Sequence, residues 1–265
     1  MSRRASRSRP SPSIVDILLA LLYPPRCPLC GRARGGAGRV RLCRACAESL
    51  RPPAAICSRC GDERGECGAS RVCARCASEP PAFRRAWSCF VYLDAAGAAT
   101  SGASGGHDGR RAIHAWKYRR DHVLGAALAG HLVECRPFAG ERYDLFVPVP
   151  LHPARLRSRG FNQAAILARE VAHGRGTFAP GVLRRSRATA SQTALGRRAR
   201  LENVRGAFAV SPRARLSGRS VLLVDDVLTS GATASECTRV LLDAGARVVD
   251  VLSLARASSP RERSG

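Results

Sequence analysis

Two adjacent carboxylates, Asp225 and Asp226, are the residues of this chain whose types and spacing most clearly suggest chemistry. A turn of hydroxyl-bearing and small residues follows them, at 229–233. Such a turn, leading into a helix, presents backbone N–H groups to a phosphate, and adjacent carboxylates can accept hydrogen bonds from vicinal hydroxyls. The pattern therefore indicates a sugar-phosphate site. It is not a Walker loop, because the Gly-Lys pair of that motif is missing.

A strand and a helix must position these groups. The four apolar residues at 221–224 are typical of a strand in a parallel sheet with both faces buried, and a helix-like run at 234–244 ends at Gly245. Ligands of open α/β sheets bind at the carboxyl ends of strands, which is where the two acids lie. The alternative interpretation is a ligand-free strand–turn–helix connection in which Asp and Thr only cap the helix.

Three guanidinium groups follow a second apolar strand, which we expect at 144–150. Arg155, Arg157 and Arg159 lie on an expected loop that precedes a helix at 162–173. Guanidinium groups match phosphate oxygens in a bidentate manner, so this loop is suited to hold pyrophosphate. A solvated basic loop is the alternative interpretation.

A further basic segment, at 191–208, combines Gln192, Arg200 and Asn203 before an expected strand at 207–210. It could form a mobile lid that excludes water from an anionic substrate, or an exposed basic helix. The other expected elements are a strand at 87–92, a flexible Gly-rich loop at 95–109, and helices at 110–120 and 122–135. Together these elements predict an α/β fold with a central parallel sheet flanked by helices.

The cysteines form two sets with the same spacing. In each set, two Cys-x2-Cys doublets are separated by twelve residues, and the eight residues are Cys27, Cys30, Cys43, Cys46, Cys57, Cys60, Cys73 and Cys76. Two such doublets supply four thiolates to a tetrahedral structural zinc ion, so we expect one or two zinc sites in a double ribbon at 24–80. The alternative is a disulfide framework of an exported protein. Cys67 fits neither set, while Cys89, Cys135 and Cys237 are expected in the core.

The net charge and the two ends of the chain indicate the function less specifically than these motifs do. The formal net charge of +24 predicts attraction to polyanions, either pyrophosphate-bearing substrates or nucleic acid. Residues 1–23 read as a basic arm followed by a short amphipathic helix, whose apolar run is too short to span a bilayer and lacks a cleavage site for export. We therefore expect a cytoplasmic protein, with a disordered tail at 258–265.

The strand, the two acids and the Thr-x-Gly-x-Thr turn resemble the ribose-phosphate signature of type I phosphoribosyltransferases. Other segments extend the resemblance to the ComF family, over roughly residues 14–256. They are the paired cysteine motifs, Trp-Lys-Tyr at 116–118, Val-Pro-Val-Pro-Leu-His-Pro at 147–153 and Arg-x-Arg-Gly-Phe-Asn-Gln-Ala at 157–164. The resemblance implies a phosphoribosyltransferase-like domain at 81–257 behind a double zinc ribbon. It also implies phosphoribosyl pyrophosphate (PRPP) and magnesium as ligands, and a role in DNA uptake during natural transformation.

The resemblance implies roles for individual residues as well. Asp225 and Asp226 would hold the ribose 2′ and 3′ hydroxyls and, with Arg200, would be catalytic. Arg157 and Arg159 would bind the pyrophosphate and, with Arg200, stabilise it as it leaves. The 5-phosphate would be held by the turn residues Thr229, Ser230, Gly231, Ala232 and Thr233.

Three functions follow as hypotheses. The first is an enzyme that transfers ribose 5-phosphate from PRPP to an acceptor and releases pyrophosphate. The second is a non-catalytic adaptor that binds single-stranded DNA or a protein of the uptake machinery. The third is a nucleobase salvage phosphoribosyltransferase, which ranks last because no segment identifies a nucleobase pocket.

Overall fold

The structure, a computed structural model, describes residues 24–34, 40–50, 56–62, 71–93, 105–118, 121–135, 138, 140–187 and 197–258. The expectations for residues 1–23, for Cys67, for Gln192 and for the tail after Ser258 lie outside these ranges. Within the described ranges, no helix combines the length and the apolar character that crossing a membrane requires.

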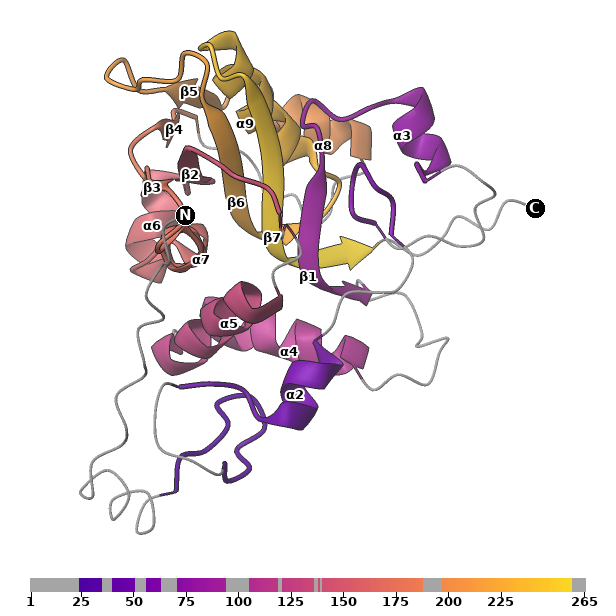
Figure 1. Cartoon of the computed structure of the whole chain (residues 1–265), viewed down its shortest axis with the longest axis vertical. Coiled ribbons are helices and arrows are strands. Elements are labelled where there is room, and N and C mark those ends of the chain that lie inside the picture. Colours follow the sequence, from indigo (N-terminus) through magenta and orange to yellow (C-terminus); the bar gives the residue numbers. More distant parts are fainter. Residues whose placement is uncertain are drawn as a thin grey trace, which may run out of the picture.

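The centre of the molecule is a five-stranded sheet in which all neighbouring strands are parallel (Figure 1). In order across the sheet, the strands are β1 (Ala86–Leu93), β7 (Val248–Ser258), β6 (Ser220–Leu228), β2 (Leu145–Pro148) and β3 (Thr177–Phe178). Alternate residues of β6 enter two separate apolar cores, with Leu222 and Val224 in one and Val221 and Leu223 in the other. Both faces of the strand are therefore buried, which explains its continuous apolar sequence.

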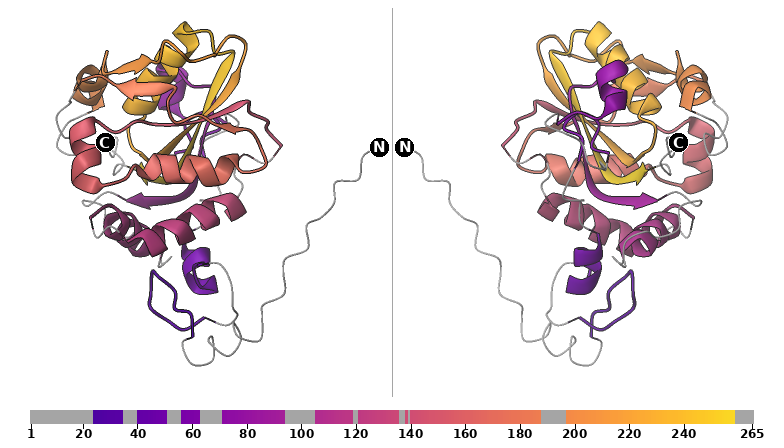
Figure 2. Two further views of the ribbon diagram at one scale, coloured as in Figure 1. Left: turned by 90° about the vertical axis from the view of Figure 1, so that its left-hand side faces the viewer. Right: turned by 90° about the vertical axis from the view of Figure 1, so that its right-hand side faces the viewer.

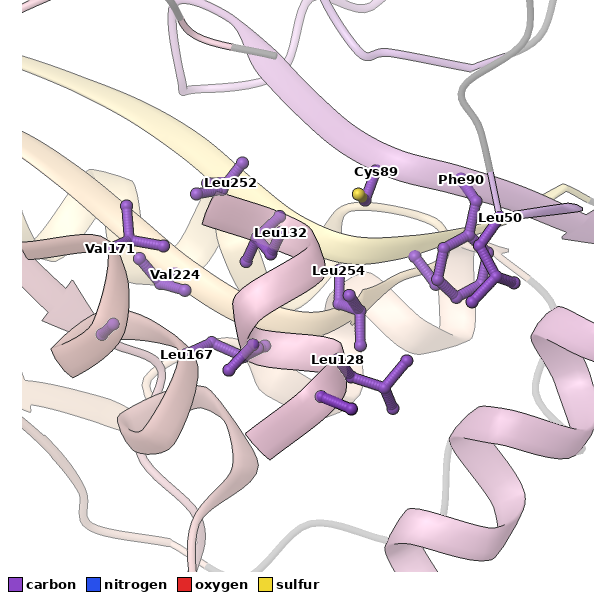
Figure 3. Close-up of a cluster of buried hydrophobic side chains, with 14 of the residues drawn as sticks. Leu50, Cys89, Phe90, Leu128, Leu132, Leu167, Val171, Val224, Leu252 and Leu254 are labelled. Atoms are coloured by element: carbon purple, nitrogen blue, oxygen red, sulfur yellow. The ribbon is translucent and has the colours of Figure 1, made fainter. Parts of the chain in front are cut away.

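Helices cover both faces of this sheet, which confirms the predicted fold class. One face is covered by α4 (Gly105–Tyr118), α5 (His122–Cys135) and α7 (Gln163–Ala172), and the other by α9 (Ala232–Asp243). In Figure 3, Leu132 of α5 and Leu167 of α7 belong to the same apolar cluster as Val224 of β6 and Leu252 of β7. Each fully buried leucine of this kind contributes about 1.5–3 kcal/mol to stability.

The remaining elements border the sheet. Strands β4 (Leu183–Arg185) and β5 (Phe208–Val210) form a separate antiparallel pair. Helix α8 (Arg197–Val204) lies between these two strands in the sequence. Helix α6 (Pro153–Arg159) follows β2, while the short helices α2 (Arg44–Ser49) and α3 (Ala74–Ser78) each carry the last cysteine of one set.

The expected loop at 151–161 is wrong, because most of it forms α6. His152 is the N-cap residue, and its Nδ1 accepts a hydrogen bond from the backbone N–H of Ala154 at 3.3 Å. Pro153 fits the first turn, where no backbone N–H is needed. Gly160 ends the helix in the left-handed conformation, with φ of 82°.

Two other elements are longer than expected. Helix α4 begins at Gly105, inside the expected Gly-rich loop. Gly109 permits close packing there, since a Cβ at this position would lie 2.8 Å from Cε2 of Phe90. Strand β6 continues through both acids to Leu228, because β7 pairs with it as far as Arg256. The helix expected at 122–135 is confirmed as α5.

The two cysteine sets lie apart on the α/β fold (Figures 1 and 2). The first set lies next to α4 and α5, where Leu50 is fully buried and its carbonyl oxygen accepts a hydrogen bond from Nε2 of His131 at 2.8 Å. The second set lies at the start of β1, where the N–H of Ala86 donates to the carbonyl oxygen of Arg59 at 2.9 Å. Each ribbon is therefore attached to the α/β domain by its own contacts.

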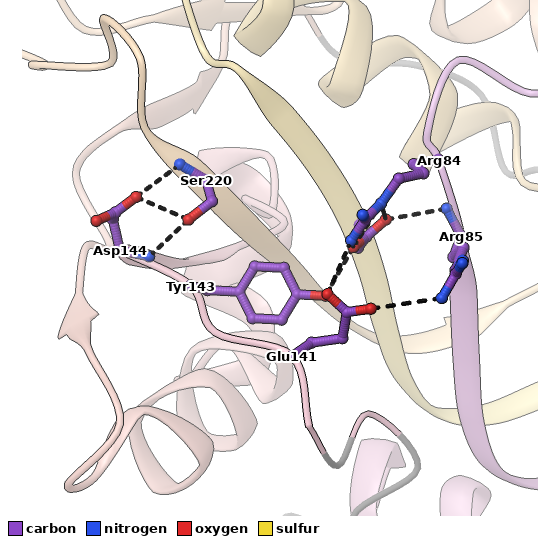
Figure 4. Close-up of polar contacts among 7 residues, drawn as sticks. Arg84, Arg85, Glu141, Tyr143, Asp144 and Ser220 are labelled. Atoms are coloured by element: carbon purple, nitrogen blue, oxygen red, sulfur yellow. Dashed lines mark hydrogen bonds and ion pairs between the residues drawn. The ribbon is translucent and has the colours of Figure 1, made fainter.

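A buried carboxylate fixes the entry into β1 (Figure 4). Asp250 of β7 is fully buried and forms an ion pair with Arg84. Its Oδ1 also accepts a hydrogen bond from the N–H of Arg85 at 3.0 Å, and its Oδ2 accepts one from the hydroxyl of Tyr143 at 2.7 Å. These contacts join the residues before β1 to β7 and to the segment that enters β2.

Candidate functional site

A cavity of about 700 Å³ opens at the carboxyl ends of β2 and β6. It is lined by the two acids of β6, by the turn before α9, and by residues of α4, α6 and the start of α7. Strand β4 and helix α8 contribute one arginine each. The cavity therefore lies where open parallel sheets bind ligands, and its volume suits a small phosphorylated molecule.

The structure brings most of the predicted site residues to this cavity. Those that line it are Asp225, Asp226, Thr229, Gly231, Thr233, Arg159 and Arg200. Ser230, Ala232 and Arg157 are not among the lining residues. Ser230 instead closes the turn from within, because its Oγ accepts a hydrogen bond from the N–H of Ala232 at 3.4 Å.

The turn before α9 is shaped by one glycine. Gly231 is the N-cap residue of the helix and has φ of 81°, a left-handed conformation that favours glycine. As a glycine it contributes no capping side chain, and Ser230 takes only the N–H of Ala232, so the first turn of α9 presents its other backbone N–H groups and the positive end of the helix dipole. Since Thr229 and Thr233 line the cavity on either side, the turn can bind an anion such as a phosphate.

The two acids differ in their surroundings. Asp226 forms an ion pair with Lys117 of α4, with 2.8 Å between Oδ2 and Nζ. Asp225 accepts a hydrogen bond at Oδ1 from the N–H of Asp226 at 2.8 Å. Burial and then the neighbouring charge of Asp226 raise the pKa of Asp225 to about 8, against the opposing effects of the hydrogen bond from the N–H of Asp226 and of the charge of Lys117. The pair therefore combines one ion-paired carboxylate with one that resists ionisation.

Helix α6 directs two of its three arginines toward the cavity. Arg155 and Arg159 are four residues apart, so they share one face of the helix, and both line the cavity. Arg157 lies two residues from each, on the other side of the helix, and is exposed. The sequence alone suggested one site role for all three arginines. Only the helical structure of residues 153–159 shows that Arg157 faces away from the cavity.

Three cationic residues that line the cavity were not predicted as site residues from the sequence: Arg110, Lys117 and Arg185. Lys117 is the only lysine of the chain, a signal that could have drawn attention to it. Arg185 of β4 is half-buried, and burial together with repulsion from Arg155 lowers its pKa. Arg185 lies in a strand of only three residues, and no sequence motif around it indicated a place in the site. With the arginines of α6 and α8, these residues form a cationic wall that suits a polyanion.

A buried amide also faces the cavity. Gln163, the first residue of α7, lines the cavity but is only 1% exposed. Its Oε1 accepts a long hydrogen bond from Nη1 of Arg159 at 3.5 Å, while its Nε2 has no hydrogen-bond partner among the described residues. A buried donor without a partner costs about 1–3 kcal/mol, and a ligand oxygen in the cavity would remove this cost.

The two cysteine sets fit structural zinc ions. In each set, the four Sγ atoms lie within 4.8 Å of one another, and none of the four is in a disulfide. Backbone N–H groups point at the sulfurs: Cys43 donates to Sγ of Cys27 and Cys73 donates to Sγ of Cys57, each at 3.3 Å. Burial raises the pKa of Cys27. The backbone hydrogen bonds that its sulfur accepts, from Cys43, Cys30 and Leu29, outweigh burial and lower this pKa to about 7. Four thiolates without an open position match a structural site.

A third group of possible ligands is already paired within the protein. Cys89, His131 and Cys135 also lie within 4.8 Å of one another. Nε2 of His131 carries the proton that it donates to the carbonyl oxygen of Leu50, and it lies 3.5 Å from Sγ of Cys135. This group therefore forms a hydrogen-bond network that attaches the end of α2 to α5. Cys89 is fully buried, as a core residue is expected to be.

Comparisons with known proteins agree with this architecture. Residues 18–82 match the family model described as a double zinc ribbon domain, and residues 156–264 match the model described as a phosphoribosyl transferase domain. DNA utilization protein YhgH of Salmonella typhimurium is 36% identical over 150 residues, which cover 54% of this chain and 65% of that protein. Competence protein F of Haemophilus influenzae is 33% identical over 118 residues, which cover 43% of this chain and 51% of that protein.

The chain thus spans less than two thirds of the length of either relative. Among solved structures, adenine phosphoribosyltransferase of Thermoanaerobacter pseudethanolicus is 16% identical, with a TM-score of 0.33, over 52% of this chain and 83% of that chain. The chain carries a double zinc ribbon and a phosphoribosyltransferase domain, and the names of its relatives agree with the resemblance to the ComF family.

Proposed function

We propose that this protein binds PRPP together with magnesium in the cavity at the ends of β2 and β6, and that it transfers ribose 5-phosphate to an acceptor. The observation that carries the proposal is the composition of this one cavity: a carboxylate pair, a helix N-terminus and a cationic wall. These three parts match the hydroxyls, the 5-phosphate and the pyrophosphate of PRPP in chemistry.

Each part of PRPP has a complementary part of the cavity. The ribose hydroxyls would donate to Asp225 and Asp226, and the 5-phosphate would accept hydrogen bonds from the turn at 229–233. Arg155 and Arg159, which both line the cavity, would bind the pyrophosphate, whereas Arg157 is on the exposed side of α6. The two carboxylates also suit magnesium, which would neutralise part of the pyrophosphate charge.

Binding would rearrange one contact of the cavity. Oδ2 of Asp226 is held by Lys117 at 2.8 Å, so a ribose hydroxyl must share or replace this ion pair. Once released, the ammonium of Lys117 lies within a cavity that holds pyrophosphate oxygens. The carboxylate of Asp226 would then bind the ribose, and the ammonium of Lys117 would bind the pyrophosphate.

In the transfer step, a lone pair of the acceptor forms a bond to C1 of the ribose while the bond from C1 to the pyrophosphate oxygen breaks. The electron pair of the broken bond leaves with the pyrophosphate. Arg200 and the other cations would stabilise this negative charge, and Asp226, together with Asp225 once its carboxyl is ionised, would stabilise the positive charge that develops on the sugar. Fixed positions of both groups would supply most of the rate enhancement.

Calorimetry with PRPP and magnesium tests the binding. A variant with both Asp225→Asn and Asp226→Asn should bind at least about a hundredfold more weakly, because each hydrogen bond to a charged group contributes about 1.5–3 kcal/mol. Asp243→Asn, an exposed carboxylate at the end of α9, is the matched control and should bind as the wild type does. Wild-type protein that fails to bind PRPP would refute the proposal.

A screen for pyrophosphate release with amines and nucleobases tests the transfer. Release that requires an acceptor and disappears in the double Asn variant supports catalysis. PRPP binding without release for any acceptor would favour a non-catalytic role.

A second candidate, a nucleic-acid adaptor, is favoured by the net charge of +24 and by relatives named for DNA utilization and competence. Contacts to DNA would then be mainly to phosphates, so binding should weaken steeply with salt. The double Asn variant should still bind single-stranded DNA if this function is separate from the cavity. In either role we expect the protein in the cytoplasm, where its cysteine thiols stay reduced.

A further inference from the structure

One aromatic side chain supports the turn at 229–233 from behind. Phe83 is only 1% exposed and belongs to the core between the sheet and α9. Its ring lies against Gly231: a Cβ at Gly231 would be 3.7 Å from both Cε1 and Cζ of Phe83. Phe83 does not line the cavity, so it can act on a ligand only through the turn.

Phe83 precedes β1, and the second cysteine set holds the start of that strand. The N–H of Ala86 donates to the carbonyl oxygen of Arg59, which lies between the first two cysteines of the set, at 2.9 Å. Gly61 packs directly against Ala86, since a Cβ at Gly61 would lie 2.8 Å from its carbonyl oxygen. The ribbon and the strand therefore meet through their backbones, where there is no flexible side chain to absorb a shift.

A buried arginine makes a second attachment on the neighbouring strand. Arg256 of β7 is 1% exposed, and its Nη1 donates to the carbonyl oxygen of Cys60 at 3.1 Å. Its Nη2 donates to Oδ2 of Asp62, also at 3.1 Å. The guanidinium therefore binds the first knuckle of the ribbon at two points, one of them the backbone of a cysteine.

Residues between Phe83 and Ala86 are also fixed. The N–H of Arg84 donates to the carbonyl oxygen of Val249 at 3.0 Å, and both Arg84 and Arg85 bind the buried carboxylate of Asp250 (Figure 4). Every residue from the ribbon contact to Phe83 is thus held by the sheet or by the ribbon.

We propose that the second four-cysteine ribbon is a positioning element of the candidate site, which acts through Phe83 to hold Gly231 and the turn at 229–233 in shape. The inference rests on the proposed binding of a phosphorylated sugar at that turn. The first ribbon lies next to α4 and α5, and its buried residues belong to the other apolar core, not to the core that contains Phe83.

The proposal predicts an effect on one end of the ligand only. The turn would hold the 5-phosphate, whereas the cations of α6, β4 and α8 would hold the pyrophosphate. Disturbing Phe83 should therefore weaken the binding of ribose 5-phosphate and of PRPP by the same factor. Binding of inorganic pyrophosphate should not change, which a general loss of stability could not produce.

Calorimetry with these three ligands on Phe83→Leu tests this effect. We expect about tenfold weaker binding of ribose 5-phosphate and PRPP, and pyrophosphate binding within about twofold of the wild type. Phe146→Leu is the matched control, because Phe146 is equally buried but packs against Gly176, away from the cavity. Equal weakening of all three ligands, or equal effects of the two variants, would overturn the proposal.

Hydrogen exchange tests the role of the ribbon without a ligand. The amides at 229–233 should exchange faster in Cys73→Ser than in Cys43→Ser, which removes the equivalent cysteine of the first ribbon. Equal exchange in the two variants would refute the coupling. If Cys73→Ser does not fold, Arg256→Gln, which removes the hydrogen bonds from β7 to Cys60 and Asp62 of the second ribbon, takes its place in the comparison. Because this readout needs no PRPP, its outcome is separate from that of the proposed function.

Discussion

Asp225→Asn should stabilise the protein against unfolding at pH 8 while weakening its binding of PRPP. In the native structure, burial and then the charge of Asp226 raise the pKa of Asp225 from 3.8 to about 8. The unfolded chain ionises this carboxyl near its ordinary value, so between about pH 4 and pH 8 the native state holds a proton that the unfolded state has released. The stability contributed by this group is therefore lost as pH rises through that window.

The size of the effect follows from the width of the window. Each pKa unit corresponds to about 1.4 kcal/mol, so the wild type should lose up to about 4 kcal/mol through Asp225 between pH 5 and pH 8. The amide of Asp225→Asn has nearly the same shape but does not ionise. The advantage of the variant over the wild type should therefore grow by about 1–4 kcal/mol over this range, the lower part allowing for solvent that reaches a half-buried group.

Urea unfolding at pH 5 and pH 8 measures this difference. Asp243→Asn serves as the control, because its side chain is exposed and paired with Arg239 on the surface of α9. An advantage of Asp225→Asn that is the same at both pH values would refute the desolvation of Asp225. A variant that gains stability but keeps full affinity for PRPP would refute its role in the site.

Three further predictions concern packing, a buried charge and metal content. Gly125→Ala should lower the free energy of unfolding by about 1–3 kcal/mol in thermal unfolding, because a Cβ there would lie 2.3 Å from Nε1 of Trp116. Asp250→Asn should cost about 1–3 kcal/mol in urea unfolding, since it weakens the hydrogen bonds that the buried carboxylate accepts from Arg84, while Arg84 keeps its ion pair with Glu141; a cost below about 0.5 kcal/mol would contradict this. Elemental analysis should find one zinc ion for each four-cysteine set, and Cys73→Ser should keep only the ion of the first set.

The strand, the acids and the turn could be predicted because several local signals coincide there. The apolar run fixes a buried strand, the two carboxylates follow it directly, and the small residues allow the left-handed turn at Gly231. The cysteine spacing was equally direct, since metal geometry restricts which spacings can form a four-thiolate site. In both cases the information lies within a short segment of the chain.

The composition of the cavity wall was harder to predict, because it depends on which face of an element each side chain occupies. Arg155 and Arg157 have identical side chains, and their separation follows only once residues 153–159 are known to be helical. His152, Pro153 and Gly160 carried that signal as a cap, a first-turn proline and a helix-ending glycine, but they were interpreted as a loop.

The attachment of the ribbons had no local signal at all. Arg256 of β7 contacts Cys60 of the second ribbon, 196 residues away in the sequence. Asp250 contacts Arg84, in the segment that joins this ribbon to β1, 166 residues away. Such contacts arise from tertiary packing, so the sequence predicted two ribbons but not where each would lie. The same holds for Lys117, which meets Asp226 only because α4 packs next to the end of β6.

That ion pair has a practical consequence for experiments. Lys117 is the only lysine in the chain, and its ammonium lies 2.8 Å from Asp226 in the cavity wall. Acylating reagents such as N-hydroxysuccinimide esters therefore meet a single side-chain amine, besides the α-amino group. The extent of modification at this one position, read by mass spectrometry, reports occupancy of the cavity without any engineered label.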